Sequence, residues 1–280
     1  MNLILSRKGF DTSAGGVPSP ILPDGTLVSL PIPDSGSRIK YCDLVHPELN
    51  LGTMVKQLSR NKVIGRDGAH LDPDLVAGHY PRLPGWRPVL GQTGSAQGHL
   101  RKQGVANGDL FLFFGLFRVA EKRGRKWQFV PGTTPQHMLW GWLQIDEIIN
   151  VDMMQEDRYP WLSYHPHLHG RPDSNNTLYL AREQLMIDGL STKTPGSGVF
   201  KTFNPSFCLT DENSALPSQW RLPSWFYPDQ RQPLSYHSKL ERWQREDESC
   251  LLRCAARGQE FVLDLEQYPE ALDWLGQLLE

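Results

Sequence analysis

Leu110-Phe111-Leu112-Phe113-Phe114-Gly115-Leu116-Phe117 is the stretch of sequence that decides the fold. Seven of its eight residues are large and apolar, and the turn sequence Asn107-Gly108-Asp109 comes just before it. A short apolar run that starts at a turn predicts a strand buried on both faces. A second apolar run, MLWGWLQI at 138–145, follows the basic turn at 122–126. We therefore expect the two runs to pair as a long hairpin.

The remaining elements are shorter and lie on both sides of this pair. Apolar runs at 3–5, 27–30, 177–181 and 261–265 predict further strands. Helical spacing of apolar residues predicts a helix that begins near Asn50 and a closing helix over 269–279. The segment 9–33 is rich in Gly, Pro, Ser and Asp, which predicts an irregular loop or short hairpins. The segment 206–236 is dense in Pro, Trp and Ser, and we expect its aromatic residues rather than regular structure to order it.

The composition points to one large β-rich unit. The chain has 280 residues with 25 Gly and 22 Pro, so many turns separate short elements. We expect an α+β protein whose core is either a mixed sheet or a barrel, with a few peripheral helices. No repeat or low-complexity linker divides the sequence, so we expect a single compact domain over 1–280, with a seam near residue 85 as the alternative.

Charge and hydropathy exclude several classes of protein. The formal net charge is −2, so no global positive field attracts nucleic acid, and any such binding must use local patches. The chain has no apolar stretch of about 18 residues, and the apolar run at its N-terminus is too short for a signal peptide. We therefore expect a cytoplasmic protein without membrane contact. The four cysteines lack the spacing of a four-thiolate zinc site, so we expect free thiols.

The first candidate site follows the first predicted strand. Ser6, Arg7 and Lys8 lead into a loop that holds Asp11 and the pair Gly15-Gly16. Cations, hydroxyls and glycine backbone N–H groups together are suited to holding an anion such as phosphate. The order of residues is not that of a phosphate-binding P-loop. A solvated loop at the end of a sheet explains the same residues equally well.

The second candidate site is His70-Leu71-Asp72-Pro73-Asp74. An imidazole and two carboxylates within five residues can bind a divalent metal or act as a general base, and Asp72 and Asp74 are the candidate metal ligands. The alternative, which we weigh more heavily, is a turn or helix start in which Asp72 or Asp74 is a cap.

The third candidate site is a glycine-rich loop predicted for 91–100, which includes Gly94, Gln97, Gly98 and His99, with Arg101 and Lys102 directly after it. Glycines let the backbone approach a ligand closely, an amide can read the edge of a base, and cations can meet a phosphate. The alternative is a wide turn before the buried strand.

Two further patterns carry less weight. His165, His167 and His169 alternate, which is compatible with metal binding, but the prolines around them favour an irregular surface crossing. The aromatic stretch 220–227 can stack nucleobases beside Arg221, although core packing is the more frequent use of such residues. The motifs of serine hydrolases, kinases, zinc proteases and dinucleotide-binding folds are missing.

The glycine-rich run GQTGSAQGHL at 91–100 and the run GDLFLFFG at 108–115 resemble those of a known family, the nucleotide modification associated domain of the third type, found in bacteria and phages. The segments 5–11, 70–74 and 257–264 support the resemblance, which covers essentially the whole chain. It implies a role in modifying or handling unusual bases in DNA, with no established reaction. Separately, the Gly108-Asp109 step and the strand around Gly141 resemble base-binding barrels of the PUA, ASCH and EVE type.

The leading interpretation is an enzyme or enzyme subunit, a transferase or hydrolase, that acts on a nucleotide or on a base in DNA. Phosphate would contact Arg7, Lys8, Arg101 and Lys102, and the base would meet Gln97 and nearby aromatic side chains. Asp11, His70 and Asp72 would act as acid, base or metal ligands. A base in duplex DNA must be flipped out to reach such a site. The near-neutral charge favours a free nucleotide or DNA delivered by a partner protein. The cofactor is open, with a divalent metal as the candidate. The alternatives are a non-catalytic reader of a modified base and a scaffold in a DNA-modification or phage-defence complex.

Overall fold

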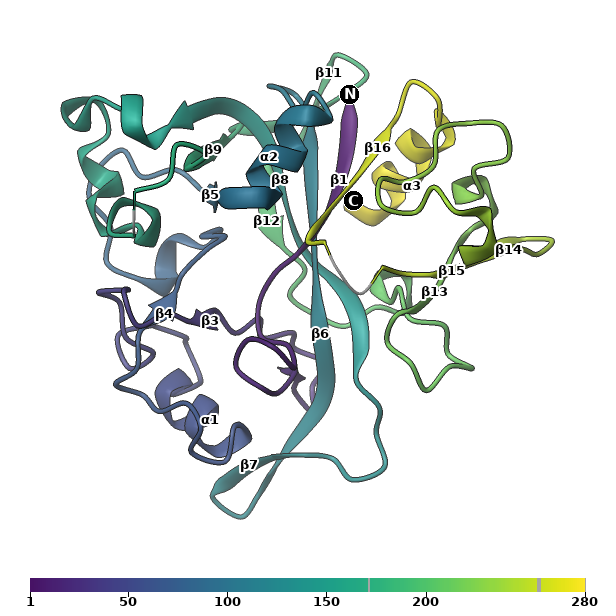
Figure 1. Ribbon diagram of the computed structural model, residues 1–280. Helices are drawn as coiled ribbons and strands as arrows, with labels where there is room; N and C mark the ends of the chain where they lie inside the picture. The colour runs from purple at the N-terminus through teal and green to yellow at the C-terminus, as the bar shows by residue number, and fades with distance from the viewer. Residues whose placement is uncertain (171, 256–257, 280) are drawn as a thin grey trace.

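Two long antiparallel strands form the centre of the protein. The computed structural model describes residues 1–170, 172–255 and 258–279 (Figure 1). Strand β6 (Leu110–Arg123) pairs with β8 (Gln136–Asn150) from Leu110 opposite Gln144 to Phe117 opposite Gln136. The predicted pairing is thus confirmed. Between them β7 (Lys126–Phe129) turns back on the far end of β6, so the basic turn closes a hairpin of its own.

The sheet around this pair has nine strands and is mixed, as the composition predicted. Its main order is β16-β1-β6-β8-β9-β5, where β1 runs parallel to β6 and the other neighbours are antiparallel. Strands β2 and β7 extend the β6 pairing, and β12 pairs with β8. The bounds are β1 Asn2–Arg7, β2 Ser19–Ile21, β5 Val89–Gln92, β9 Thr177–Ala181, β12 Ser197–Val199 and β16 Glu260–Asp264.

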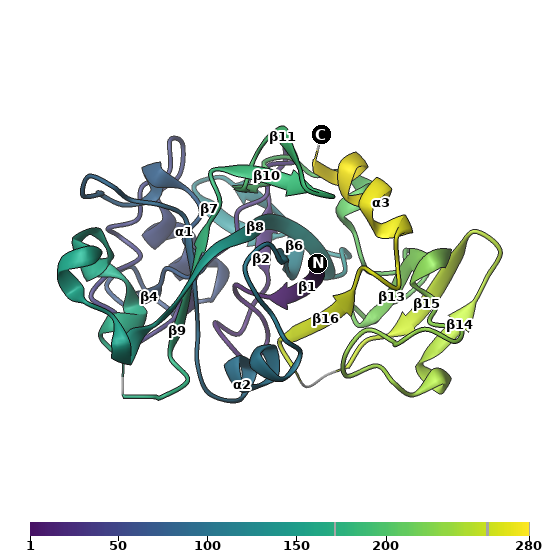
Figure 2. The same cartoon turned by 90° about the horizontal axis from the view of Figure 1, so that it is seen from above.

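The sheet is open, so the barrel alternative is not confirmed. Its terminal strands β16 and β5 share no backbone ladder in the described parts of the chain. Helix α2 (Gly94–Lys102) follows β5 directly and packs against β16. Figure 2 shows this helix between the two sides of the sheet. The loop predicted for 91–100 is therefore wrong, because the side chains of Leu100 and Gln97 are buried and stabilise a helix despite two glycines.

Three smaller sheets and two further helices complete the fold. Helix α1 (Leu51–Leu58) starts as predicted at Asn50, whose Oδ1 accepts a hydrogen bond from Thr53 N at 2.8 Å, and α3 (Glu270–Leu279) is the predicted closing helix. The small sheets consist of β3 (Ile32–Pro33) with β4 (Ala69–His70), β10 (Gln184–Ile187) with β11 (Leu190–Pro195), and β13 (Gln219–Pro223) with β15 (Ser249–Arg253) and β14 (Trp243–Arg245). Short 3-10 helices span Ala77–His79, Val151–Met153, Glu156–Arg158, Pro160–Tyr164, Pro166–Leu168, Pro205–Phe207, Ser224–Phe226 and Leu240–Arg242.

Two predictions about local structure are corrected. The strand expected at 27–30 is reduced to isolated bridges, one of which joins Leu27 to Ile21. The segment 206–236 contains the regular strand β13, because Trp220 is fully buried and its indole N–H donates to His137 Nδ1 at 3.0 Å. Core packing therefore uses this tryptophan, and it is not available to stack a nucleobase.

Strand β6 is buried on both faces, as predicted. Leu112 and Phe114 pack on one side with Trp220 and Phe261, beneath α3 and the small sheet of β13–β15. Phe111 and Phe113 pack on the other side with residues of β8 and β9. The main sheet contains strands from before and after residue 85. That the chain is a single domain, with a seam near residue 85 as the alternative, stays a prediction. None of the described helices is long and apolar enough to cross a membrane.

One buried histidine predicts how folding stability depends on pH. His237 Nε2 accepts from Ala255 N at 2.9 Å and Nδ1 lies 2.8 Å from Ser235 O, and burial lowers the pKa of this imidazole to about 4. Since the folded pKa is below the unfolded value, stability is lost as pH falls below about 6.5. We expect a loss of about 2 kcal/mol at pH 5 from this group. The His237→Gln variant should lose this share of the dependence in urea unfolding, while other buried histidines with a lowered pKa, such as His137, keep theirs. His169→Gln, at a partly exposed position, should keep the full dependence.

Candidate functional site

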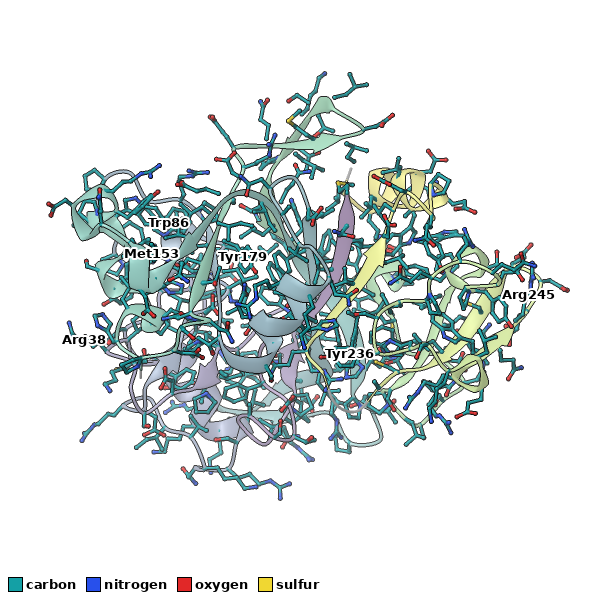
Figure 3. The ribbon with its side chains drawn as sticks, turned by 45° about the horizontal axis from the view of Figure 1, so that its top comes forward. Arg38, Trp86, Met153, Tyr179, Tyr236 and Arg245 are labelled. Atoms are coloured by element: carbon teal, nitrogen blue, oxygen red, sulfur yellow. The ribbon has the colours of Figure 1, made fainter. Side chains whose placement is uncertain are left out.

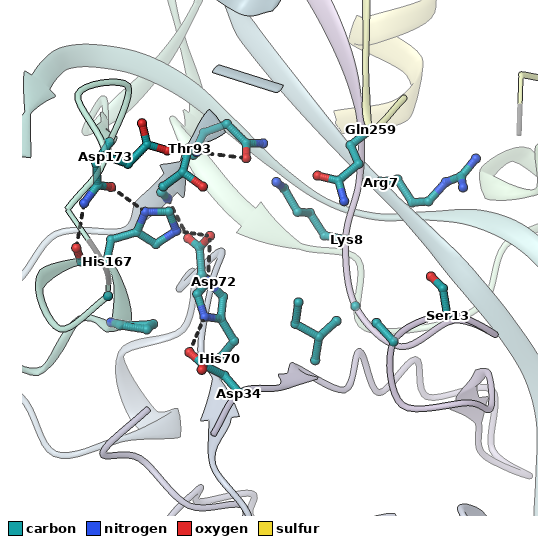
Figure 4. Close-up of a pocket in the computed structure, with 18 of the residues that line it drawn as sticks. Arg7, Lys8, Ser13, Asp34, His70, Asp72, Thr93, His167, Asp173 and Gln259 are labelled. Carbon is teal, nitrogen blue, oxygen red and sulfur yellow. Dashed lines mark hydrogen bonds and ion pairs between the residues drawn. The ribbon is translucent and has the colours of Figure 1, made fainter. Parts of the chain in front are cut away.

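A cavity of about 770 Å³ opens where four segments meet beside the sheet (Figure 4). Lys8 comes from the end of β1, His70 from β4, Gln92 from the end of β5, and His167 from the short 3-10 helix Pro166–Leu168. These segments are far apart in the sequence, and the sheet brings them together. The second predicted site thus lies on the cavity wall, next to part of the first.

His70, Asp72 and His167 form a compact group on this wall. One potential ligand atom from each lies within 4.8 Å of the others. Asp72 Oδ2 is 3.8 Å from His70 Nε2 and 3.5 Å from His167 Nε2. Two imidazole nitrogens and one carboxylate oxygen that converge in this way form a ligand set for a divalent transition metal.

Each of the two imidazoles is oriented by a second polar group. His70 Nδ1 is 2.9 Å from Asp34 Oδ2, and His167 Nδ1 is 2.8 Å from Asn176 Oδ1 (Figure 4). Asn176 is itself fixed, because its Nδ2 donates to the carbonyl oxygen of His167 at 2.7 Å. Nδ1 of each ring is held by these oxygens, so Nε2 is the ring nitrogen that faces Asp72. Metal-binding histidines are usually held in this way.

The Asp72 carboxylate is ionised although its side chain is only 4% exposed. Burial alone would raise the pKa of Asp72, but His165 and His167 outweigh burial and hold the pKa well below its usual range. The backbone N–H of Gly91 also donates to Asp72 Oδ1 at 2.6 Å. A charged oxygen that faces the cavity is therefore present at neutral pH.

His165 lies behind the carboxylate and is fully buried. Its Nε2 is 3.6 Å from Asp72 Oδ1, and its Nδ1 accepts from His167 N at 3.4 Å. Burial lowers the pKa of His165 to about 4 despite the neighbouring carboxylate, so the ring is neutral. His165 is therefore a neutral ring that packs behind Asp72, outside hydrogen-bond distance.

The opposite side of the cavity carries a cation. Lys8 Nζ is 3.1 Å from Glu260 Oε1, and Gln92 Nε2 donates to the same oxygen at 2.5 Å. Glu260 is almost completely buried, so it holds the ammonium group in place beside the cavity. An anionic group of a ligand can meet Lys8 while another part of the ligand reaches the three-residue group around Asp72.

Other predicted site residues lie at or beyond the edge of this cavity. Asp11 lines it, but its Oδ1 accepts from Ser13 and Ala14 and stabilises the loop. The Arg7 guanidinium lies over the Phe114 ring and points away from Lys8 (Figure 4). Ser6 is buried and does not line the cavity; it lies opposite Glu260 in the β1–β16 pair.

Asp74 belongs to a different cluster from Asp72. It is bound to Arg82 at 2.7 Å and accepts from the Tyr164 hydroxyl at 2.5 Å. Burial raises the pKa of Asp74 to about 6 despite the arginine. The structure therefore separates the two aspartates that the sequence grouped as metal candidates.

The third predicted site lies on α2, away from the cavity lining. Gln97 Oε1 accepts from the buried Tyr179 hydroxyl at 2.7 Å, and the His99 ring packs at a tilt against Tyr236. Figure 3 shows the two tyrosines on different sides of this helix. Arg101 donates to Asn175 at the surface, and Gly94 N donates to Asp173. Neither Gly98 nor Lys102 lines the cavity. Of this set, Gly94 is the residue that supports the cavity wall, through Asp173.

Several residues of the site were missed from the sequence, among them His167, Asp34 and Asn176. The alternating histidines gave a signal for His167, which the surrounding prolines outweighed. Asp34 and Asn176 gave none, because single polar residues in loops reveal their partners only after folding. Arg257, in one of the segments that carry the family resemblance, lies outside the described residues.

The fold and the cavity define an α+β protein with an open mixed sheet and a candidate metal-binding pocket at its edge. The family model of nucleotide modification associated domain 3 matches residues 2–264, so the chain belongs to that family. A search of curated proteins and a search of solved structures gave no match. The family name connects the chain with nucleotide modification. It does not say whether the protein catalyses a modification or recognises a modified base.

A substitution at Gly91 tests the geometry of the site without removing any candidate metal ligand from the sequence. A β-carbon at this position would lie 2.3 Å from the His167 ring, so Gly91→Ala must displace the imidazole. We expect metal affinity to fall by about 10-fold or more, as for other changes behind metal ligands. Gly98→Ala is the matched control, because a β-carbon there would meet Asn175 Nδ2 at 3.9 Å, an ordinary contact, and alanine favours the helix. Equal affinity of both variants for Co²⁺ in calorimetry would contradict this geometry.

Proposed function

We propose that the protein is a divalent-metal-dependent enzyme that acts on a nucleotide or on a nucleobase. The observation that carries this proposal is the pair of imidazoles whose Nδ1 atoms are fixed by Asp34 and Asn176, so that both Nε2 atoms face the ionised Asp72. His70, Asp72 and His167 would hold the metal. Three protein ligands leave open coordination positions, which is the arrangement of catalytic rather than structural metal sites.

The composition of the cavity wall favours an enzyme over a reader of modified bases. A reader needs aromatic faces on which a base can stack. Among the described residues that line the cavity there is no Phe, Tyr or Trp, whereas Lys, Asp, His, Gln and Asn are all present. This wall is suited to charged and polar groups that change during a reaction.

The two ends of the cavity suggest how a substrate is oriented. A phosphate or another anionic group would pair with Lys8, with Gln92 and Gln259 as neutral partners beside it. The reacting atom would then lie near Asp72, where a bound divalent metal supplies Lewis acidity or an activated water. This chemistry is compatible with the transferase or hydrolase class expected from the sequence. His165 would keep the carboxylate in place during the reaction.

Metal binding is the first test of this function. Calorimetric titration of the metal-free protein with Mn²⁺, Co²⁺ and Zn²⁺ should show one site for at least one of these ions. Asp72→Asn and His167→Gln should each lower its affinity at least 100-fold, because each removes a ligand or its charge. His169→Gln removes a neighbouring histidine outside the group and should leave binding unchanged. A full-affinity site in both ligand variants would refute the assignment.

A measurement of turnover distinguishes an enzyme from a non-catalytic reader. The metal-loaded protein should convert a nucleotide or a base in an oligonucleotide to a product detected by mass spectrometry, and Asp72→Asn should abolish conversion. Lys8→Met should weaken thermal stabilisation by the same nucleotide without loss of the metal, because it removes the cation at the far end of the cavity. Lys102→Met, on the exposed end of α2, is the control. Stable binding of a modified base without turnover would instead identify a reader.

A further inference from the structure

Positive charge is concentrated in two short segments of this weakly acidic protein. Residues 56–66 and 121–126 contain eight Lys or Arg residues and one acidic residue, a net charge of +7. Since the whole chain carries −2, the rest of it carries −9. We name the eight cations the cationic band; they are Lys56, Arg60, Lys62, Arg66, Lys122, Arg123, Arg125 and Lys126.

All eight side chains belong to exposed residues. None of them forms an ion pair with a carboxylate of the described residues. Glu121, the single acid, is occupied by a hydrogen bond from Gln128 Nε2 at 3.0 Å. The band is therefore an uncompensated positive surface, and such surfaces attract polyanions.

The two segments lie side by side at one end of the molecule. Helix α1 packs on the β6–β7 hairpin, where Gln57 Oε1 accepts from Trp127 N at 2.7 Å (Figure 1). The band also approaches the cavity, because a β-carbon on Gly16 would lie 3.9 Å from the Lys62 ammonium. Gly16 closes the loop whose residues Asp11 and Ser13 line the cavity. A polyanion on the band would thus run along one rim of the cavity.

We propose that the cationic band binds the backbone of duplex DNA, with the β6–β7 ribbon entering a groove. The ribbon is two-stranded, with pairs from Ala120 opposite Phe129 to Arg123 opposite Lys126, and it turns at Gly124. The major groove of B-form DNA admits a two-stranded ribbon, whereas that of A-form RNA is too deep and narrow. Four of the eight cations lie at the tip of this ribbon, where they meet phosphates on both sides of a groove.

This inference rests on the proposed function in one respect, because it makes a base within DNA the substrate of the cavity. A base in a duplex reaches the cavity only after it swings out of the stack. The cationic band would hold the flanking duplex while Lys8 meets a phosphate near the displaced base. The near-neutral charge of the chain is no obstacle, since the positive charge is local.

Fluorescence anisotropy with a labelled 20-base-pair duplex tests the surface directly. The triple variant Lys122→Glu, Arg123→Glu, Arg125→Glu should bind at least 10-fold more weakly than the native protein at low salt, and the slope of log K against log salt should fall by about two to three. The variant Lys56→Gln, Arg60→Gln, Lys62→Gln tests the α1 side independently, with a milder change. The control is Lys239→Glu, Arg245→Glu, Arg253→Glu, which makes the same charge change on exposed positions of the distant small sheet, near the labelled Arg245 of Figure 3.

The outcomes separate this inference from the metal site. Loss of duplex binding in both band variants, with the control unchanged, supports it. Equal losses in the control, or tighter binding to duplex RNA or to single-stranded DNA of the same sequence, would overturn it. Calorimetry with Co²⁺ on the same proteins is independent, because the band variants keep His70, Asp72 and His167. If the native protein binds metal but not duplex DNA, the proposed DNA-binding surface alone is refuted. If it binds duplex DNA but no metal, the proposed metal site alone is refuted.

Discussion

The carboxylate of Asp72 is charged although it is almost out of contact with water. Its negative charge must be compensated, and the pocket is arranged to do so. The loss of hydration costs several kcal/mol unless hydrogen bonds and positive groups replace it. Here the Gly91 N–H donates to one oxygen, and the rings of His165, His70 and His167 surround the group. Asp34 and Asn176 in turn orient two of those rings. These contacts come from several segments that are far apart in the sequence, so the charge of one residue ties together much of the surrounding structure.

The sheet determines that these segments meet. Strand β6 is buried on both faces, which requires a layer on each side of it. On one side the layer includes α3 and the small sheet of β13–β15. On the other, β6 packs against residues of β8 and β9, and the sheet ends at β5, after which α2 packs against β16. The remaining gap beside the ends of β1 and β5 is the cavity. Because the sheet is open, this space is free for a site. In a small closed barrel, side chains would fill the corresponding space.

The sequence predicted the parts of the fold that depend on local patterns. The doubly buried β6, its pairing with β8, the strands β1, β9 and β16, and the helices that start at Asn50 and after Pro269 follow from apolar runs and caps. The helix at 94–102 was missed because glycines outweighed the buried Leu100. His70 and Asp72 were identified because they are adjacent in sequence, whereas His167 with Asp34 and Asn176 depends on long-range packing that no local pattern encodes. Asp74 was grouped with Asp72 by proximity, yet its side chain bonds to Arg82.

The central claim is the identity of the metal ligands, and X-ray absorption spectroscopy of the zinc- or cobalt-loaded protein tests it most directly. The spectrum should show two imidazole nitrogens and carboxylate or water oxygens at about 2.0–2.2 Å, without sulfur. Loss of one imidazole from the fitted shell in His167→Gln should follow. A spectrum dominated by thiolate sulfur, or one without the multiple scattering of imidazole rings, would contradict the account.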